Sequence, residues 1–437
     1  MMRRVIKVAT VSIFTLLAVS ALAQGSKPGG SNQDSQRWIG TWAAAPQSFM
    51  PGTLQTFRNQ SLRLIVHTSA GGKKVRIRIS NTYGDSPLLI SIAHVARRTV
   101  GAEIEPSSDR QLMFQGHPST TVPARSMVVS DPVELDVPAL SDLSISLFFH
   151  ETVEARTLHI LAQQTSYVSE ETGDHTAEAK FAVAKKIHSW PFLTGVDVEA
   201  SPRGFAIVAF GSSLTDGDGT TLDANRRWPD VLAERLENSA DRKIEVGILN
   251  EGIIGNRLLK DSPQQAGSPF GGALGEAGLA RFERDVLAQP GVKFVIVGLG
   301  INDILIPGSL TPATEKVTAE SLISGYRQLI TRAHQKRIRV IATTNPPAEN
   351  SFLALSKTGP PITFYTQEKE TVRQKVNNWM RSSKEFDAVV DFDAVLRDPS
   401  RLTQLLPAYD SGDHLHPNDA GCVAEGNAVP LGMFTGD

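Results

Sequence analysis

Cysteine and long apolar runs are nearly absent from this sequence. Its 437 residues contain one cysteine, Cys422, so an intramolecular disulfide cannot form and stability depends on the burial of apolar side chains. After residue 24 no stretch comes near the ~18 consecutive apolar residues typical of a membrane-spanning helix. We therefore expect a mature protein without a membrane anchor and without a disulfide framework.

The sequence also lacks an excess of either charge. Lys and Arg number 44 and Asp and Glu number 46, which gives a formal net charge of −2. This balance offers no electrostatic basis for binding nucleic acid or an anionic membrane surface. Hydrophobic residues make up 41% and charged residues 21%, as in ordinary globular proteins, and the length suggests two or three domains of about 150 residues.

The first 23 residues have the order of a secretory signal. Three basic residues precede an apolar run at residues 8–19, and small residues follow up to Ala23, where we expect cleavage. The mature protein is then secreted or periplasmic, and an arginine pair near the start leaves both the Sec and the twin-arginine export routes open. Residues 24–37 are rich in Gly, Ser, Asn and Gln and predict a flexible leader.

Residues 38–196 are dominated by a period of two. Val75, Ile77 and Ile79 alternate with polar residues, and the same pattern recurs at residues 143–147. Glycines and prolines separate these short segments as turn residues do. The pattern predicts an accessory domain of half-buried antiparallel strands, as in a β-sandwich or jelly roll.

Residues 197–437 change to apolar strands that alternate with helices. Such alternation requires a parallel sheet with right-handed crossovers, so we expect an α/β domain. We also expect a helix to open near Trp228 and a C-terminal helix that is short or irregular around Cys422 and Gly426. The predicted strands are residues 205–210, 244–249, 294–299, 338–343 and 388–392.

A serine-containing turn follows the first of these strands. Residues 210–217 read FGSSLTDG and lie between an apolar strand and a predicted helix. Side chains at the carboxyl ends of parallel strands face the crevice where such sheets bind ligands, and a helix N-terminus directs N–H groups towards it. The alternative is that the serine only forms the turn.

Two further segments follow the second and third strands. Residues 250–257 read NEGIIGNR, in which a glycine lets a backbone N–H approach a ligand closely. Residues 300–303 read GIND, in which an asparagine amide could donate a hydrogen bond to a developing oxyanion. A turn glycine and a helix-capping asparagine are the structural alternatives.

A fourth segment, residues 413–418, reads DHLHPN. A nucleophilic serine needs an imidazole to accept its proton and a carboxylate to orient that imidazole. Asp413, His414 and His416 would also suit a metal, although no His or Cys cluster elsewhere completes such a site. Asp391 and Asp393 form a rival carboxylate pair at the end of the fifth strand. The remaining eight histidines, His159 among them, are expected to be structural or at the surface.

Together the four segments resemble the SGNH (GDSL) hydrolases over about residues 204–437. Residues 38–43 (WIGTWA) also resemble the opening of the two-domain bacterial members. The resemblance implies a flavodoxin-like parallel sheet and no metal or organic cofactor. Ser212 stands where the family usually has aspartate, which puts the usual hydrogen bonding of the turn in question. The implied site consists of the nucleophile Ser213, the pair Asp413 and His416, and oxyanion donors from the Ser213 and Gly255 N–H groups and the Asn302 side chain.

From these observations we expect a secreted serine esterase, a carboxylic ester hydrolase that acts through an acyl-enzyme. Export and the β-domain favour short acyl groups, acetyl above all, on a carbohydrate, an argument by fold analogy. An arylesterase or lipase-type acylhydrolase stays open, as does a carbohydrate-binding protein with an inactive hydrolase domain. The expected partner is a small-molecule or carbohydrate ester. The sequence contains no G-x-S-x-G motif, which argues against an α/β-hydrolase.

Overall fold

The computed structural model describes residues 37–239, 244–263, 268–355 and 359–434, which fall in one compact unit. The predicted signal peptide and leader lie outside these ranges, except for Arg37, which opens the first strand. None of the helices in the described ranges has the length and apolar character needed to cross a membrane.

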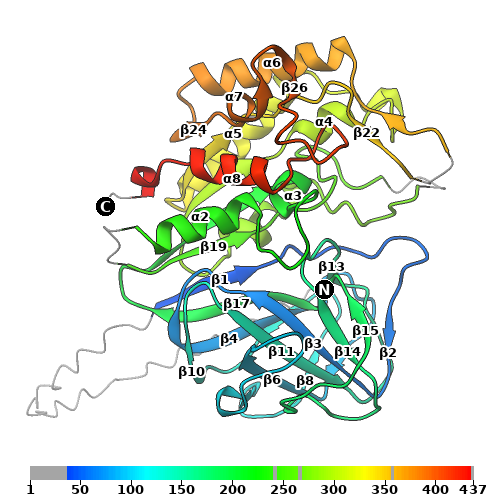
Figure 1. Ribbon diagram of the computed structural model, residues 1–437, viewed down its shortest axis with the longest axis vertical. Helices are drawn as coiled ribbons and strands as arrows, with labels where there is room; N and C mark the ends of the chain where they lie inside the picture. Colours follow the sequence, from blue (N-terminus) through cyan, green and yellow to red (C-terminus); the bar gives the residue numbers. More distant parts are fainter. Residues whose placement is uncertain (1–36, 240–243, 264–267, 356–358, 435–437) are drawn as a thin grey trace, which may run out of the picture. The chain divides into compact units, whose positions relative to one another are not determined.

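Two large antiparallel sheets and three two-stranded ones make up the described part of the chain up to residue 200 (Figure 1). The first has the order β1-β17-β4-β10, with β9 paired to β4; the second has the order β15-β14-β3-β11-β6-β7. Their bounds are β1 Arg37–Ala43, β17 Leu193–Ala200, β4 Gly72–Ser80, β10 Val133–Val137 and β9 Met127–Val129, then β15 Val183–Ile187, β14 Ser166–Ser169, β3 Gln60–His67, β11 Asp142–Phe149, β6 Ile92–Arg97 and β7 Arg110–Gln111.

Apolar residues of both sheets form one core. Val75, Ile77 and Ile79 of β4 are fully buried in it, as the period of two predicts. The expectation of a half-buried strand is wrong for β11, where Ser144 and Ser146 on the opposite face are buried as well. That face is covered by a second small apolar cluster formed by Ile65, Ala102, Tyr167 and Phe181. The sandwich or jelly-roll topology itself stays a prediction.

The predicted parallel sheet is present in the second half of the chain. Among the described residues its five strands lie in the order β19-β18-β20-β21-β24, which is 2-1-3-4-5 in chain order and is the flavodoxin-like arrangement. In such a sheet the crevice for ligands opens beside the first strand, β18, where the strand order reverses. The bounds are β18 Phe205–Gly211, β19 Val246–Asn250, β20 Val292–Gly298, β21 Arg339–Thr343 and β24 Ala388–Val390.

Helices cover both faces of this sheet, which explains why β18 is apolar without alternation. Ala206, Val208 and Phe210 pack towards α5 and α6, whereas Ile207 and Ala209 pack in the core formed with α2 and α8. Helices α2 and α8, green and red in Figure 1, run side by side. The helices are α1 Ser213–Asp216, α2 Trp228–Glu237, α3 Gly278–Phe282, α4 Ile301–Leu305, α5 Ala319–Gln335, α6 Gln367–Ser382, α7 Phe392–Leu396 and α8 Asp419–Ala428.

The structure corrects two expectations about the ends of elements and adds one helix. The serine turn leads into the single-turn helix α1, which was not expected, whereas the helix expected to open near Trp228 is confirmed as α2. The fifth strand ends before Phe392 because the Asp391 carboxylate accepts a hydrogen bond from Ala394 N–H at 3.2 Å and caps α7. The C-terminal helix α8 is regular, and Gly426 allows it to lie close to α2, since a Cβ there would be 2.7 Å from Val231 Cβ.

The antiparallel part is joined directly to the parallel sheet. Ser69 Oγ accepts a hydrogen bond from Ile248 N–H in β19 at 2.8 Å, and Gln47 Nε2 donates to Ala273 O at 2.6 Å. Strand β17 continues across residue 196, where the sequence analysis placed the boundary between two domains. The division into two domains stays a prediction.

Candidate active site

Ser213 lies at the carboxyl end of β18 and is the first residue of α1. Its side chain is buried apart from a small opening, with 4% of the residue exposed. Among the described residues its backbone N–H has no hydrogen-bond acceptor, because the first N–H groups of a helix have no partner within the helix. With only four residues, α1 has little macrodipole, so these local N–H groups supply the positive field at the site.

The C-terminal segment places an imidazole and a carboxylate beside this serine. His416 Nε2 is 2.8 Å from Ser213 Oγ, and His416 Nδ1 is 2.5 Å from Asp413 Oδ2. The other oxygen of Asp413 accepts the backbone N–H groups of Leu415 and His416, each at 2.9 Å. A carboxylate fixed in this way holds a proton on Nδ1 and leaves Nε2 to accept the serine proton.

The local electrostatics favour a charged imidazole opposite an ionised carboxylate. Burial lowers the pKa of His416, but the hydrogen bond to Asp413 and the charges of Asp218, Asp413 and Asp410 outweigh it and raise the pKa. Burial raises the pKa of Asp413, yet its hydrogen bonds with His416 and Leu415 hold that pKa at about 2. Asp413 is therefore ionised throughout the range in which His416 titrates, and it stabilises the imidazolium formed when Ser213 gives up its proton.

Gly255 and Asn302 lie at the same edge of the sheet, after β19 and β20. Gly255 has a φ of +67°, a left-handed conformation that favours glycine. In the part of the chain that the structure describes, its N–H donates to no other group. Asn302 Nδ2 donates one of its two hydrogens to Asn256 O at 3.1 Å, and the second hydrogen is available to a bound oxyanion. Both residues line the cavity that contains Ser213 and His416, as an oxyanion site requires.

Two residues that the sequence analysis did not select also belong to this site. Asp218 Oδ2 is 3.8 Å from His416 Nε2 and lines the cavity. Gly219 lies against the loop that carries the imidazole, where a Cβ would be 2.8 Å from Pro417 O. The short spacing after Ser213 is the only signal that could have indicated them.

Comparison with known proteins shows the family to which the second half of the chain is similar. The family model described as GDSL-like Lipase/Acylhydrolase matches residues 207–428. This chain belongs to that family. No curated protein matches the sequence.

Three similar solved structures each cover about half of this GDSL family member at low identity. The native aryl esterase of M. smegmatis is 20% identical, with 51% of this chain and 95% of that chain covered and a TM-score of 0.38. The carbohydrate acetylesterase Est24 from Sinorhizobium meliloti is 15% identical, with 51% and 95% covered and a TM-score of 0.37. A GDSL-like lipase from Bacteroides thetaiotaomicron VPI-5482 is 17% identical, with 52% and 87% covered and a TM-score of 0.36.

The chain departs from the usual family pattern at Ser212, and this side chain has no hydrogen-bond partner among the described residues. Ser212 is fully buried. Asp303, the aspartate that follows Asn302, is by contrast well used: its carboxylate accepts the N–H groups of Leu258 and Leu259 at 2.6 and 2.9 Å. Burial raises the pKa of Asp303 to about 6. Through these two hydrogen bonds Asp303, which is next to Asn302 in the chain, holds the turn that follows Gly255.

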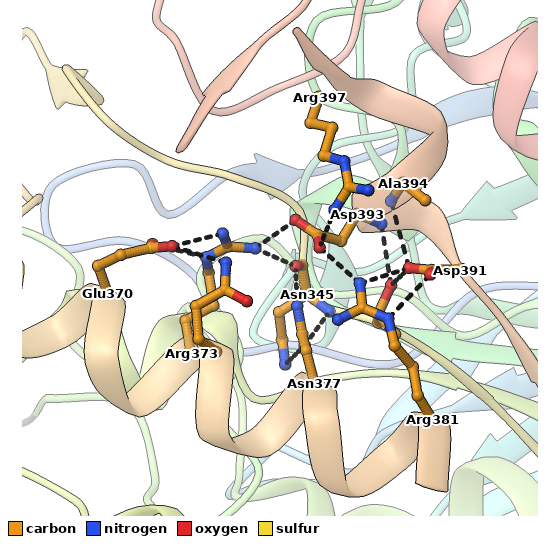
Figure 2. A network of polar contacts seen from close by, with 11 residues as sticks. Asn345, Glu370, Arg373, Asn377, Arg381, Asp391, Asp393, Ala394 and Arg397 are labelled. Carbon is orange, nitrogen blue, oxygen red and sulfur yellow. Dashed lines mark hydrogen bonds and ion pairs between the residues drawn. The ribbon is translucent and has the colours of Figure 1, made fainter. Parts of the chain in front are cut away.

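Asp391 and Asp393, the alternative carboxylates for orienting His416, form ion pairs with arginines of α6. Figure 2 shows Arg373 and Arg381 of α6 directed towards Asp391 and Asp393. Arg373 Nη1 is 2.6 Å from Asp393 Oδ1 and its Nη2 is 2.7 Å from Glu370 Oε1, all within the protein interior. This ion network ties α6 to the end of the sheet, so Asp391 and Asp393 do not orient His416.

His414 does not face the serine either. Its Nδ1 is 2.5 Å from Asp410 Oδ2, and its ring lies beside Phe352, a residue of the cavity wall. His414 and His416 therefore bind different carboxylates, which does not fit the joint metal site considered above. Over the described ranges, no three His, Cys, Asp or Glu side chains are grouped so that they could hold a metal ion.

The cavity at Ser213 has a volume of about 120 Å³ and mostly apolar walls. The polar side chains in its lining are those of Ser213, Asp218, Asn302, Asp413 and His416. The site therefore offers an apolar recess next to a nucleophile. The apolar lining consists of Ile254, Phe270, Leu274, Leu305, Ile306, Leu310, Phe352, Leu353, Phe364 and Leu415.

Proposed function

We propose that this GDSL family member is an exported serine ester hydrolase. The observation that carries the proposal is the continuous chain of hydrogen bonds from Ser213 Oγ to His416 Nε2 at 2.8 Å and from His416 Nδ1 to Asp413 at 2.5 Å. A serine in this arrangement can become a nucleophile at neutral pH.

In the proposed reaction Ser213 Oγ attacks the ester carbonyl carbon while His416 Nε2 takes its proton. The carbonyl oxygen becomes an oxyanion that the N–H groups of Ser213 and Gly255 and the Asn302 amide stabilise. The imidazolium then gives its proton to the leaving alcohol, and the acyl group stays on Ser213. Water, deprotonated by His416, attacks the acyl-enzyme and restores the free serine. The chain's own residues supply each of these steps.

The cavity supports a small apolar group on the substrate. Apolar cavities of ~150 Å³ can hold benzene, so a recess of about 120 Å³ suits a short acyl chain or a ring more than a long fatty chain. Short-chain esters, as expected from the sequence, are consistent with this size. Three phenylalanines in the cavity lining, Phe270, Phe352 and Phe364, favour aryl esters as a second candidate substrate, because aromatic side chains can stack on the ring of such an ester. Acetylated carbohydrate as the natural substrate still depends on fold analogy.

Ester panels test both proposals. We expect wild type to hydrolyse p-nitrophenyl acetate and butyrate with much higher kcat/KM than p-nitrophenyl octanoate, and comparison with an acetylated sugar ranks the two substrate classes. Ser213→Ala should abolish turnover and His416→Ala should lower kcat by several orders of magnitude, since the members of such a unit act together. Equal rates in wild type and Ser213→Ala would remove Ser213 from the mechanism, and no turnover of any ester would instead support the non-catalytic binding protein.

A further inference from the structure

Asp216, three residues after the nucleophile, connects α1 to the turn that carries Gly255. Its Oδ2 accepts a hydrogen bond from Ile254 N–H at 3.2 Å. The two segments approach so closely that a Cβ on Gly252 would lie 2.4 Å from Asp216 N. Since Ile254 directly precedes Gly255, the carboxylate fixes the backbone one residue before the proposed oxyanion donor.

A histidine from the antiparallel part holds this carboxylate in turn. His159, at the end of β13 (Leu158–His159), has Nε2 2.9 Å from Asp216 Oδ1 and Nδ1 3.0 Å from Ala45 O. A carbonyl oxygen only accepts hydrogen bonds, so Nδ1 carries a proton. His159 and Asp216 are both 2% exposed. Burial lowers the pKa of His159, but the charge and hydrogen bond of Asp216 outweigh it and raise the pKa, which favours a charged imidazole beside this carboxylate.

Arg227 provides a second tether at the same place. Its Nε donates to Asp216 O at 2.7 Å, and its guanidinium also donates to Ala162 O in the antiparallel part. The guanidinium lies 5.7 Å from the ring of Trp190, which packs beside His159. Side-chain and backbone oxygens of Asp216 are thus both fixed from outside the parallel sheet.

We propose that Asp216 and His159 are positioning residues for ester hydrolysis. His159 fixes the side chain of Asp216, and Asp216 fixes the Ile254–Gly255 backbone relative to Ser213. The antiparallel part then contributes to catalysis by ordering the oxyanion site, without touching the substrate. This inference rests on the proposed function.

The chain offers a conservative replacement that separates position from charge. In Asp216→Asn the amide oxygen can accept from Ile254 N–H while the amide N–H donates to a neutral His159 Nε2, so both hydrogen bonds can be remade without charge. Asp216→Ala removes both. A matched control is Asp109→Ala, which breaks a similar pair, His94–Asp109 at 2.9 Å, outside the active site.

The experiment compares these variants with p-nitrophenyl butyrate as substrate and phenylboronic acid as a transition-state analogue. We expect Asp216→Ala to lower kcat about 100-fold with KM changed by less than about threefold, since a misplacement of ~1 Å costs about that much. Its affinity for phenylboronic acid should fall by a comparable factor. Asp216→Asn should stay within about tenfold of wild type, and Asp109→Ala should be unchanged.

Two results would overturn the inference: Asp216→Ala folded with kcat within twofold of wild type, or Asp216→Asn as impaired as Asp216→Ala. If Asp216→Ala shows no cooperative unfolding transition, the test is made with His159→Gln. Glutamine can still donate a hydrogen bond to Asp216 but cannot bridge Asp216 and Ala45 O as the imidazole does. We then expect about a tenfold loss of kcat at unchanged KM, and an unchanged kcat refutes the role. Absence of ester turnover in wild type itself would refute the proposed function, which is a distinguishable outcome.

Discussion

Asp218 should set the pH at which this hydrolase becomes active. His416 must be neutral to accept the proton of Ser213, so activity is lost as the pH falls through the pKa of His416. That pKa is raised above its ordinary value of 6.5, with Asp218 among the causes. Asp218→Asn removes this charge and leaves the hydrogen bond between His416 and Asp413 in place. The acid limb of kcat/KM should therefore move to lower pH in the variant.

The size of the shift follows from distance and exposure. Asp218 Oδ2 is 3.8 Å from His416 Nε2, and a third of the Asp218 side chain is exposed to solvent (33%). Two unit charges near 4 Å apart interact by about 1 kcal/mol in water and about 4 kcal/mol at an effective dielectric constant of 20. Solvent screening places this pair near the lower value, so the expected shift is about 0.7 pH unit.

The assay is kcat/KM for p-nitrophenyl butyrate from pH 5 to 9, with acid release measured by titration at constant pH. The plateau at high pH should stay within about threefold of wild type. Asp136→Asn, which removes an exposed carboxylate on β10, is the control and should leave the limb in place. A limb that stays fixed in Asp218→Asn, or moves to higher pH, would refute the electrostatic reasoning.

Three further substitutions test other parts of the structure. Asn302→Ala should lower kcat about 10²–10³-fold with little change in KM, because the amide donates to an oxyanion that exists only in the transition state; a raised KM at constant kcat would contradict this. Ser212→Ala should leave kcat within about threefold and the midpoint of thermal unfolding unchanged or higher, since the buried Oγ has no described partner; a large loss of stability would show otherwise. Arg373→Met should lower the free energy of unfolding by about 3–5 kcal/mol in urea because it leaves the Glu370 carboxylate buried without its arginine and removes one of the arginines that contact Asp393. Arg327→Met, which breaks an exposed pair, should cost less than about 1 kcal/mol, and equal losses would disprove the distinction.

Local patterns predicted much of the architecture and the identity of the residues at the site. The apolar run before Ser213 becomes β18 because a strand covered by helices on both faces must be apolar throughout. The helix expected to open near Trp228 becomes α2. The positions of Ser213, Gly255 and Asn302 in the segments that follow strands could be read from turn residues after apolar runs.

Other features depended on contacts that no local pattern encodes. β11 is buried on both faces because segments distant in sequence cover its polar side. Asp391 ends a strand early because it caps α7, and its pairing with Arg381 excludes it from the active site. The histidine at position 159 has the appearance of an ordinary strand residue, and only its approach to Asp216 links it to the nucleophile helix.

The sequence by itself determined which chemical groups this protein can use: a serine, an imidazole, a carboxylate and amide donors, each beside a turn. It did so because strand ends, turn glycines and short spacings are local properties of the chain. Only the tertiary structure decided that Asp413 rather than Asp391 is hydrogen-bonded to His416, that Asp218 faces the imidazole, and that Asp216 contacts both His159 and the Ile254 N–H. The contact between His416 and Ser213 joins residues 203 positions apart in the chain, so it forms only when the chain folds.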